Sequence, residues 1–239
     1  MKSEARIEYK YYLPTYLEHE FLAELKLFTR LDHYANRDRG GYDVASIYYD
    51  TMELCSYHEK IEGMAKRLKL RLRFYLPEVL NQFFNVELKH RVFDRIVKMK
   101  TIISGKEMEV LLKEDSPMVD PQHVNPTIAY LSRRVIQEYY QPFVRIDYFR
   151  KPFYDIHDPD LRITIDSQIY CARFYGNLFL KPDIPVVNEG LHVLEIKSPN
   201  YCPFWLKTLI EKYKLDRISI SKYLLSVQNL AVNSSFFSK

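Results

Sequence analysis

Charged and apolar residues alternate along much of this sequence, and this alternation constrains the fold more than any other feature. The clearest case is the segment 68–75, LKLRLRFY, in which Leu or Phe takes every second position. The positions between them are Lys69, Arg71 and Arg73. Successive side chains of a β-strand point to opposite faces of a sheet. The period of two therefore predicts a strand with one apolar face and one cationic face.

The same alternation recurs in other segments of the chain. It is found at 4–12, 45–51, 84–91, 95–103, 143–150, 161–167 and 192–198. For one strand the simplest explanation is a solvated face, because antiparallel sheets commonly bury one face and expose the other. At least six strands share the pattern, however, and their polar faces carry mainly Lys, Arg, Glu and Asp. We therefore expect the strands to close into a barrel with the charges inside.

Helical patterns separate the strands and supply cover for an apolar outer surface. They are expected at 15–30, 104–114, 126–139, 204–214 and 219–230. The second begins with a capping box, because Ser104 is followed three residues later by Glu107. The proline-rich stretch 181–185 is expected to be a loop rather than a linker. The sequence thus predicts an α+β fold, an antiparallel β-barrel (tunnel) of about eight strands flanked by helices, formed as a single domain over residues 1–239.

Composition excludes several classes of protein. The three cysteines, Cys55, Cys171 and Cys202, are too scattered for a disulfide framework or a zinc site, which favours the reducing cytoplasm. No segment approaches the roughly 20 apolar residues of a membrane span. The net charge is only +4, so a preference for anions has to come from the positions of the charges. Aromatic residues alternate with the charges instead of joining them on one surface, which argues against nucleic-acid binding.

The predicted interior holds more cations than carboxylates. The cations are Lys10, Lys69, Arg71, Arg73, Lys89, Lys98, Arg162 and Lys197, and the carboxylates are Glu8, Glu87, Asp166 and Glu195. Enclosed cations are costly unless an anion joins them. A triphosphate or longer phosphate chain would supply that charge, and one or two carboxylates could hold a divalent metal ion on it. The alternative for Lys98, Lys100 and Arg91 is an ordinary surface position, and for Tyr148 a place in the core.

A series of segments, taken in order, resembles VTC-type polyphosphate polymerase domains. They are RIEYKYY, SIYYDT, LKLRLRFY, VELKHR, DYFRKPF, LRITID, HVLEIKS and SISKYLLS, and they extend from Arg6 to about Leu225. Such domains belong to the triphosphate tunnel metalloenzyme superfamily and are related to CYTH domains. The resemblance implies a transferase that moves the γ-phosphate of ATP to a growing inorganic polyphosphate chain inside a basic tunnel. It further implies Mn²⁺ or Mg²⁺ as cofactor and ATP and polyphosphate as ligands, and it leaves open association with a separate membrane protein.

The resemblance also implies a role for individual residues. The catalytic set would be Arg71, Arg73, Lys89, Arg150, Arg162 and Lys222. The substrate phosphates would be contacted by Lys10, Lys69, Lys98, Tyr148, Lys197 and Ser221. Glu195, the acidic residue of LEIK, would hold the metal ion. Arg145 cannot share a strand face with Tyr148 and Arg150 unless a bulge intervenes, so it is left without a role.

Two departures from the family pattern keep other functions open. CYTH enzymes begin with Glu-x-Glu-x-Lys, whereas Arg6 occupies the first acidic position here, which leaves fewer metal ligands. Some polymerases carry a basic residue three positions before the SKY lysine, where this chain has Ser219, with Arg217 as a substitute. A metal-dependent triphosphatase, acting on an inorganic or nucleoside triphosphate, and a non-catalytic sensor of polyphosphate or nucleotides are therefore the alternatives. Transfer and hydrolysis differ only in the nucleophile, so the lining residues hardly separate them.

Overall fold

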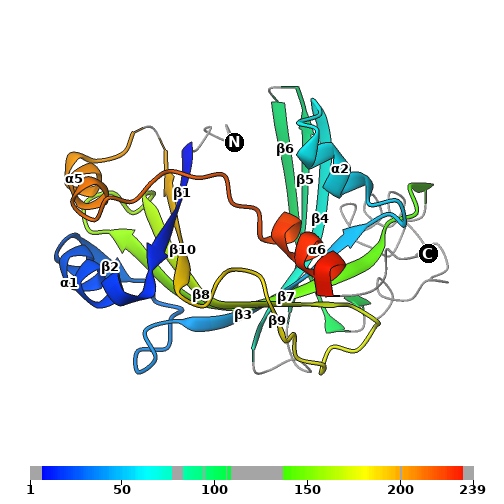
Figure 1. The fold of residues 1–239 in the computed structure, drawn as a ribbon, viewed down its shortest axis with the longest axis horizontal. Helices are drawn as coiled ribbons and strands as arrows, with labels where there is room; N and C mark the ends of the chain where they lie inside the picture. The colour runs from blue at the N-terminus through cyan, green and yellow to red at the C-terminus, as the bar shows by residue number, and fades with distance from the viewer. Residues whose placement is uncertain are drawn as a thin grey trace. The chain divides into compact units, whose positions relative to one another are not determined.

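The computed structural model describes residues 7–76, 83–93, 95–105, 107–108, 137–199 and 201–233. Its strands are β1 (Ile7–Pro14), β2 (Thr29–Leu31), β3 (Tyr42–Asp50), β4 (Lys66–Leu76), β5 (Phe84–Val92), β6 (Arg95–Ile103), β7 (Gln141–Asp155), β8 (Arg162–Arg173), β9 (Ile184–Pro185) and β10 (Leu191–Ser198). Its helices are the 3₁₀ turn η1 (Thr15–Leu17), α1 (Glu18–Phe28), α2 (Cys55–Ile61), α5 (Phe204–Lys212) and α6 (Lys222–Asn233) (Figure 1).

The strands form one sheet of ten strands in the order β1-β10-β8-β7-β3-β4-β5-β6, with β2 pairing β7 and β9 pairing β8. The pairs β1–β10, β10–β8, β2–β7, β4–β5 and β5–β6 are all antiparallel. The expected α+β class with an antiparallel sheet and flanking helices is confirmed. The order is linear, with β1 and β6 as its edge strands, so hydrogen bonding within the described residues gives an open sheet.

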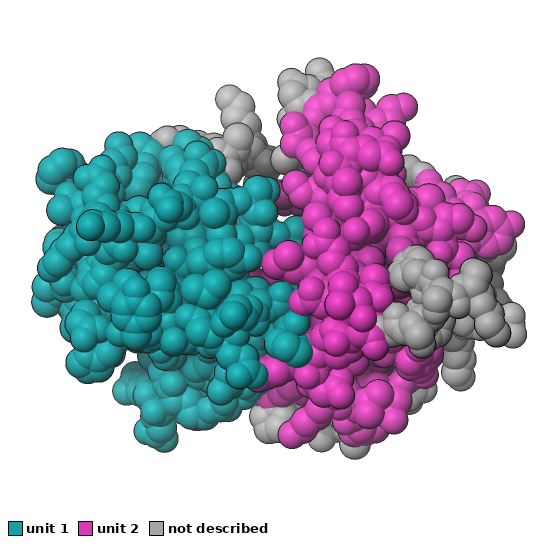
Figure 2. Space-filling model, viewed as in Figure 1, with its two compact units in different colours: residues 1–43, 148–169, 185–221 teal, residues 44–147, 170–184, 222–239 magenta. Residues whose placement is uncertain are grey.

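The chain divides into two compact units, coloured separately in Figure 2. Unit 1 comprises residues 1–43, 148–169 and 185–221, and unit 2 comprises residues 44–147, 170–184 and 222–239. Strands β3, β7, β8 and β9 contribute residues to both units. Because the segments of the two units interleave along the sequence, no single cut in the chain separates them. The single domain expected from the sequence stays a prediction.

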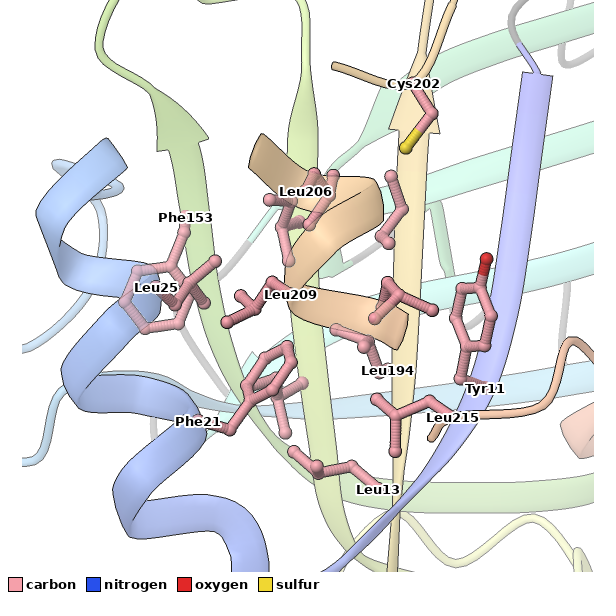
Figure 3. Packing of buried hydrophobic residues seen from close by; sticks show 14 of the residues in the cluster. Tyr11, Leu13, Phe21, Leu25, Phe153, Leu194, Cys202, Leu206, Leu209 and Leu215 are labelled. Carbon is pink, nitrogen blue, oxygen red and sulfur yellow. The ribbon is translucent and has the colours of Figure 1, made fainter. Parts of the chain in front are cut away.

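The core of unit 1 lies between helices α1 and α5 and the apolar face of β1, β10 and β8 (Figure 3). Phe21 and Leu25, one turn apart on α1, are fully buried there. Leu206 of α5 and Leu194 of β10 are also fully buried in the same cluster. Each such side chain contributes ~1.5–3 kcal/mol through burial. Covering one face of these strands leaves the opposite, charged face for other uses.

The core of unit 2 uses the apolar positions of β3, β4 and β5. The cross-strand register sets Leu70 opposite Leu88 and Leu72 opposite Val86, and all four are almost completely buried. Because side chains alternate along a strand, this register also fixes which residues meet on the charged face. The alternation that predicted these strands therefore predicted the burial of their apolar positions correctly.

Helices were predicted less completely than strands. The capping box is confirmed, because the Ser104 backbone N–H donates to Glu107 Oε2 at 2.7 Å. Residues 109–136, which include most of the two helices expected at 104–114 and 126–139, lie outside the described residues. Helix α2 was not expected, since its N-cap, Leu54, offers no side-chain cap. Among the described residues, no helix is both long enough and apolar enough to cross a membrane.

Candidate functional site

The charged face of unit 2 contains a row of lysines that oppose one another across three strands. Lys69 of β4 pairs in register with Lys89 of β5, and Lys89 pairs with Lys98 of β6. Directly opposed side chains on one face have Cβ atoms about 4.5–5.5 Å apart, and like charges in such positions destabilise a sheet. Lys69 is half-buried, whereas Lys89 and Lys98 are exposed. We call these three residues the lysine row.

The next row of the same face is built around one carboxylate. Glu87 lies opposite Arg71 and Lys100. Arg71 Nε donates to Glu87 Oε2 at 2.9 Å, and Arg73 Nη1 lies 3.6 Å from Glu87 Oε1. Burial opposes the ionisation of Glu87, but the charges of Arg71 and Arg73 prevail and lower its pKa. Glu87 thus organises two guanidinium groups side by side.

Tyr48 of β3 and the start of α6 complete this face. Arg71 Nη1 donates to the Tyr48 hydroxyl at 3.2 Å, and the Tyr48 ring stacks on the ring of Tyr223 at 5.4 Å between centroids. Burial opposes the ionisation of Tyr48, but Arg71, Arg73 and Lys222 together lower its pKa to about 8. Sequence reasoning missed this tyrosine. The alternation in β3 would have indicated it, because Ile47 and Tyr49 point into the core and Tyr48 therefore points to the charged face.

The charged face of unit 1 consists of alternating charges on β1 and β10. In register, Lys10 lies opposite Glu195 and Glu8 lies opposite Lys197. Along the strands, Lys10 Nζ is 2.7 Å from Glu8 Oε1, and Lys197 Nζ is 2.7 Å from Glu195 Oε1. Lys10 also donates to the backbone carbonyl of Ile220 at 3.2 Å. The structure therefore brings together three of the predicted site residues, Lys10, Glu195 and Lys197.

Arg150 and Tyr148 of β7 lie in unit 1 with Asp166 of β8. Arg150 donates from Nε and Nη2 to the two oxygens of Asp166, at 2.7 and 2.8 Å. Its guanidinium carbon lies 5.2 Å from the centre of the Tyr148 ring. Burial favours the neutral form of Arg150, but Asp166, Tyr148 and Glu195 outweigh it and raise its pKa well above the usual value. Arg150 therefore keeps its charge although it is largely enclosed.

Two further predicted site residues, Arg162 and Ser221, lie beside the charged groups described above. Arg162 starts β8 opposite Lys197, but its Nη1 donates to Asp32 Oδ2 at 2.9 Å. Its side chain is 49% exposed, so the guanidinium could leave Asp32 for a ligand at little cost. Ser221 is the last residue of unit 1, directly before α6.

Arg145, which the sequence left without a role, forms an ion pair inside unit 2. Arg145 is buried and donates to both oxygens of Asp147, at 2.8 and 2.7 Å, in unit 2. Its guanidinium carbon also lies 5.6 Å from the centre of the Phe74 ring. Arg145 thus serves the structure through its ion pair with Asp147. Arg217, the expected substitute for a basic residue at Ser219, stacks over the Tyr9 ring at 4.5 Å.

The residues around Glu195 fit a divalent metal ion only if phosphate completes its shell. Glu195 is buried, and the register places Glu8 diagonally from it on the same face. No three His, Cys, Asp or Glu side chains in the described ranges lie close enough together to hold a metal ion. Mg²⁺ bound beside phosphates commonly uses only one or two carboxylates and takes its remaining ligands from phosphate and water. Glu195, with Glu8 nearby, matches that donor set.

Comparison with known proteins identifies the family. The family model described as VTC domain matches residues 5–231. No curated protein matches the chain. Among solved structures, a candidate adenylate cyclase from Bacillus halodurans aligns with a TM-score of 0.55 at 11% identity, over 91% of this chain and 94% of that one. A candidate adenylate cyclase from Vibrio parahaemolyticus aligns at 14% identity over 94% and 98% of the chains, with a TM-score of 0.47. At 11% identity, the first of these alignments supports a likeness of fold alone.

Proposed function

Because the chain belongs to the VTC domain family, we propose that it is a polyphosphate polymerase that transfers the γ-phosphate of ATP to a growing inorganic polyphosphate chain. The observation that carries this proposal is the lysine row of unit 2. Its three lysines oppose one another in register, which gathers positive charge on one face of the sheet.

The length of the lysine row favours a chain of linked phosphates over a single one. Neighbouring strands lie ~4.8 Å apart, so the row crosses roughly 10 Å from β4 to β6. One phosphate could reach only part of that distance. Arg71 and Arg73 flank the row, and guanidinium groups bind phosphate oxygens through two parallel hydrogen bonds. We therefore expect the lysines to attract an ATP triphosphate or a polyphosphate segment by their charge. The arginines would bind its oxygens through paired hydrogen bonds.

Phosphoryl transfer asks a protein mainly for positioning and for neutralisation of charge. In the proposed reaction, an oxygen of the terminal phosphate of the growing chain attacks the γ-phosphorus of ATP in line. The bond to the β-phosphate oxygen breaks, and ADP leaves. The attacking oxygen is already ionised, so the reaction requires no protein base. We assign stabilisation of the transferred phosphoryl group to Arg71, Arg73 and Lys89, and orientation of the acceptor to Lys222.

The charged face of unit 1, considered by itself, carries the remaining residues to which we assign roles, including the metal ligand. We assign phosphate contacts there to Lys10, Tyr148, Lys197 and Ser221, and a catalytic role to Arg150 and Arg162. Glu195 would hold Mn²⁺ or Mg²⁺. When bound, that ion would neutralise charge on the phosphate oxygens and polarise the phosphorus for attack. Lys197, which already lies 2.7 Å from Glu195, would place a further positive charge beside the same phosphates.

The proposal is tested by incubating the protein with ATP and Mn²⁺ and separating the products by chain length. We expect phosphate chains together with ADP. Free phosphate as the only phosphate product would assign the protein to hydrolysis, and retained binding of ATP without turnover would make it a sensor. Glu195→Gln should lose turnover and still bind tripolyphosphate. Lys212→Gln is the matched control, because Lys212 is an exposed lysine of α5 paired with Glu24.

A further inference from the structure

Tyr48 occupies a position on the charged face of unit 2 that the proposed reaction does not use. Its hydroxyl oxygen accepts a hydrogen bond from Arg71 at 3.2 Å, which engages the acceptor side of the phenol. Among the described residues, no acceptor is found for its own proton. The ring is held by stacking on Tyr223, with an angle of 25° between the planes. The hydroxyl therefore has a fixed place among cations and a proton to donate.

The groups that face Tyr48 come from several elements and are mostly cationic. Arg71 and Arg73 approach from β4, and Lys222 approaches from the first residue of α6. Glu87 of β5 is already bound to Arg71, and Lys100 of β6 lies opposite Glu87. Tyr223 of α6 directs its own hydroxyl to Asp50. The surroundings of Tyr48 thus combine an excess of positive charge with a carboxylate that is already paired.

We propose that the Tyr48 hydroxyl is a direct ligand of the bound phosphate chain, donating a hydrogen bond to it, and that ionisation of this phenol releases the chain. The inference rests on the proposed function, because it concerns the same phosphate-binding face. The cations that surround the phenol also stabilise the phenolate. In that form Tyr48 carries no proton to donate and places a negative charge beside the substrate.

The sign of the pH dependence follows from these two forms. The pKa of Tyr48 is about 8, so the phenol is neutral at pH 7 and mostly ionised at pH 9. A bound polyanion disfavours the phenolate, so binding above pH 8 takes up a proton. By linkage, the affinity for phosphate chains falls as the pH rises through this range. If one proton is involved and the bound polyanion raises the pKa of Tyr48 far above 9, the affinity falls by about tenfold between pH 7 and pH 9.

The test uses inorganic tripolyphosphate, which requires binding but no turnover. Its dissociation constant is measured by calorimetry at pH 7 and pH 9 for the wild type, Tyr48→Phe and Tyr139→Phe. Tyr139 is an 81% exposed tyrosine of unit 2 and serves as the matched control. Ionisation of the ligand and of the lysines affects all three proteins equally. We expect the wild type and Tyr139→Phe to lose up to about tenfold more affinity than Tyr48→Phe does.

A second measurement on the wild type alone covers the case in which Tyr48→Phe does not fold. Ultraviolet titration should detect a tyrosine that ionises near pH 8, and tripolyphosphate should move that ionisation to higher pH. An ionisation that the ligand leaves unchanged, or equal pH dependence in Tyr48→Phe, overturns the inference and leaves the proposed function intact. Failure of the wild type to bind tripolyphosphate at any pH overturns both.

Discussion

At the scale of single residues, the two arginines around Glu87 show how a sheet face can prepare for an anion. Glu87 holds Arg71 through Nε at 2.9 Å and lies 3.6 Å from Arg73 Nη1. The carboxylate fixes the orientation of both guanidinium groups before a ligand binds. Preorganisation of this kind reduces the side-chain entropy lost on binding.

Replacing the Arg71 fork by a single ammonium group should weaken phosphate binding without unfolding the protein. In Arg71→Lys we expect about a tenfold weaker affinity for tripolyphosphate, because a lysine keeps the charge and loses the bidentate geometry. Calorimetry measures this change. Lys212→Gln should stay close to the wild type. An affinity for Arg71→Lys equal to that of the wild type would show that the fork is not used.

The Glu18 carboxylate supplies a prediction about stability in unit 1. A hydrogen bond from His192 is the main reason that the pKa of Glu18 falls to about 2; burial opposes the shift, and Lys151 supports it. A lowered pKa stabilises the folded state above the unfolded value near 4.5, and the contribution is lost as the pH falls toward 2. Glu18→Gln should cost ~2 kcal/mol at pH 7 after allowance for partial exposure.

Urea unfolding of the wild type and Glu18→Gln at pH 7 and pH 3 measures this difference. The difference in the free energy of unfolding between the wild type and Glu18→Gln should be smaller at pH 3 than at pH 7. A gap that is constant with pH would mean that the ion pairs of Glu18 contribute nothing to stability.

At the scale of elements, the start of α6 is held to β3 by a buried hydrogen bond. The Tyr223 hydroxyl donates to Asp50, whose carboxylate also accepts from the backbone N–H groups of Ser56 and Tyr57 in α2. Burial and the Asp50 charge together raise the pKa of Tyr223 well above its usual value, so it remains a donor. Asp50 thereby fixes both α2 and the end of α6 that carries Lys222.

Removing that hydrogen bond should misplace Lys222 while leaving most of the core intact. For Tyr223→Phe we expect a loss of about tenfold in kcat, because positioning errors act on the transfer step, with a much smaller change in KM. Steady-state kinetics with ATP separate the two constants. Tyr140→Phe is the matched control, since its hydroxyl contacts Ser56 Oγ of α2 at 3.0 Å in the same core. An equal loss of kcat in Tyr223→Phe and Tyr140→Phe would show that Tyr223 contributes only to stability.

The elements also show how far the sequence could predict the structure. The alternation predicted β4, β5 and the other long strands, because one apolar face had to be buried. Strands β2 and β9 have only three and two residues, too few for a periodic signal. Helix α2 is capped by Asp50 from outside the helix, so no local signature marks its start. Register and partner choice, such as Arg150 with Asp166, depend on tertiary pairing that alternation does not specify.

At the scale of the whole molecule, bound phosphate chains should stabilise the fold. A ligand that binds only the folded state stabilises it by RT ln(1 + [L]/Kd), which is ~2.7 kcal/mol at one hundred times Kd. We expect tripolyphosphate to raise Tm, and the increase to shrink with added NaCl because salt screens exposed charges such as Lys89 and Lys98. Thermal unfolding with and without ligand at two salt concentrations measures both effects. A Tm that tripolyphosphate does not change would argue against a polyanion site.

The candidate site could be predicted from the sequence to a similar extent as the fold. The charged side of strands such as β4 and β5 was predicted, and so was the family, whose model matches residues 5–231. The lysine row required the register of β4, β5 and β6, and the role proposed for Tyr48 required knowing that it lies against Arg71. Location in the cytoplasm and a separate membrane partner stay predictions of the sequence alone.

The central claim is that the lysine row and its neighbours serve synthesis of phosphate chains. The most direct measurement follows ATP labelled in its γ-phosphate during incubation with the protein and Mn²⁺. We predict that the label accumulates in acid-stable chains longer than triphosphate, with one ADP formed for each phosphate added, and that Glu195→Gln abolishes both products. Recovery of all the label as free phosphate would contradict the account.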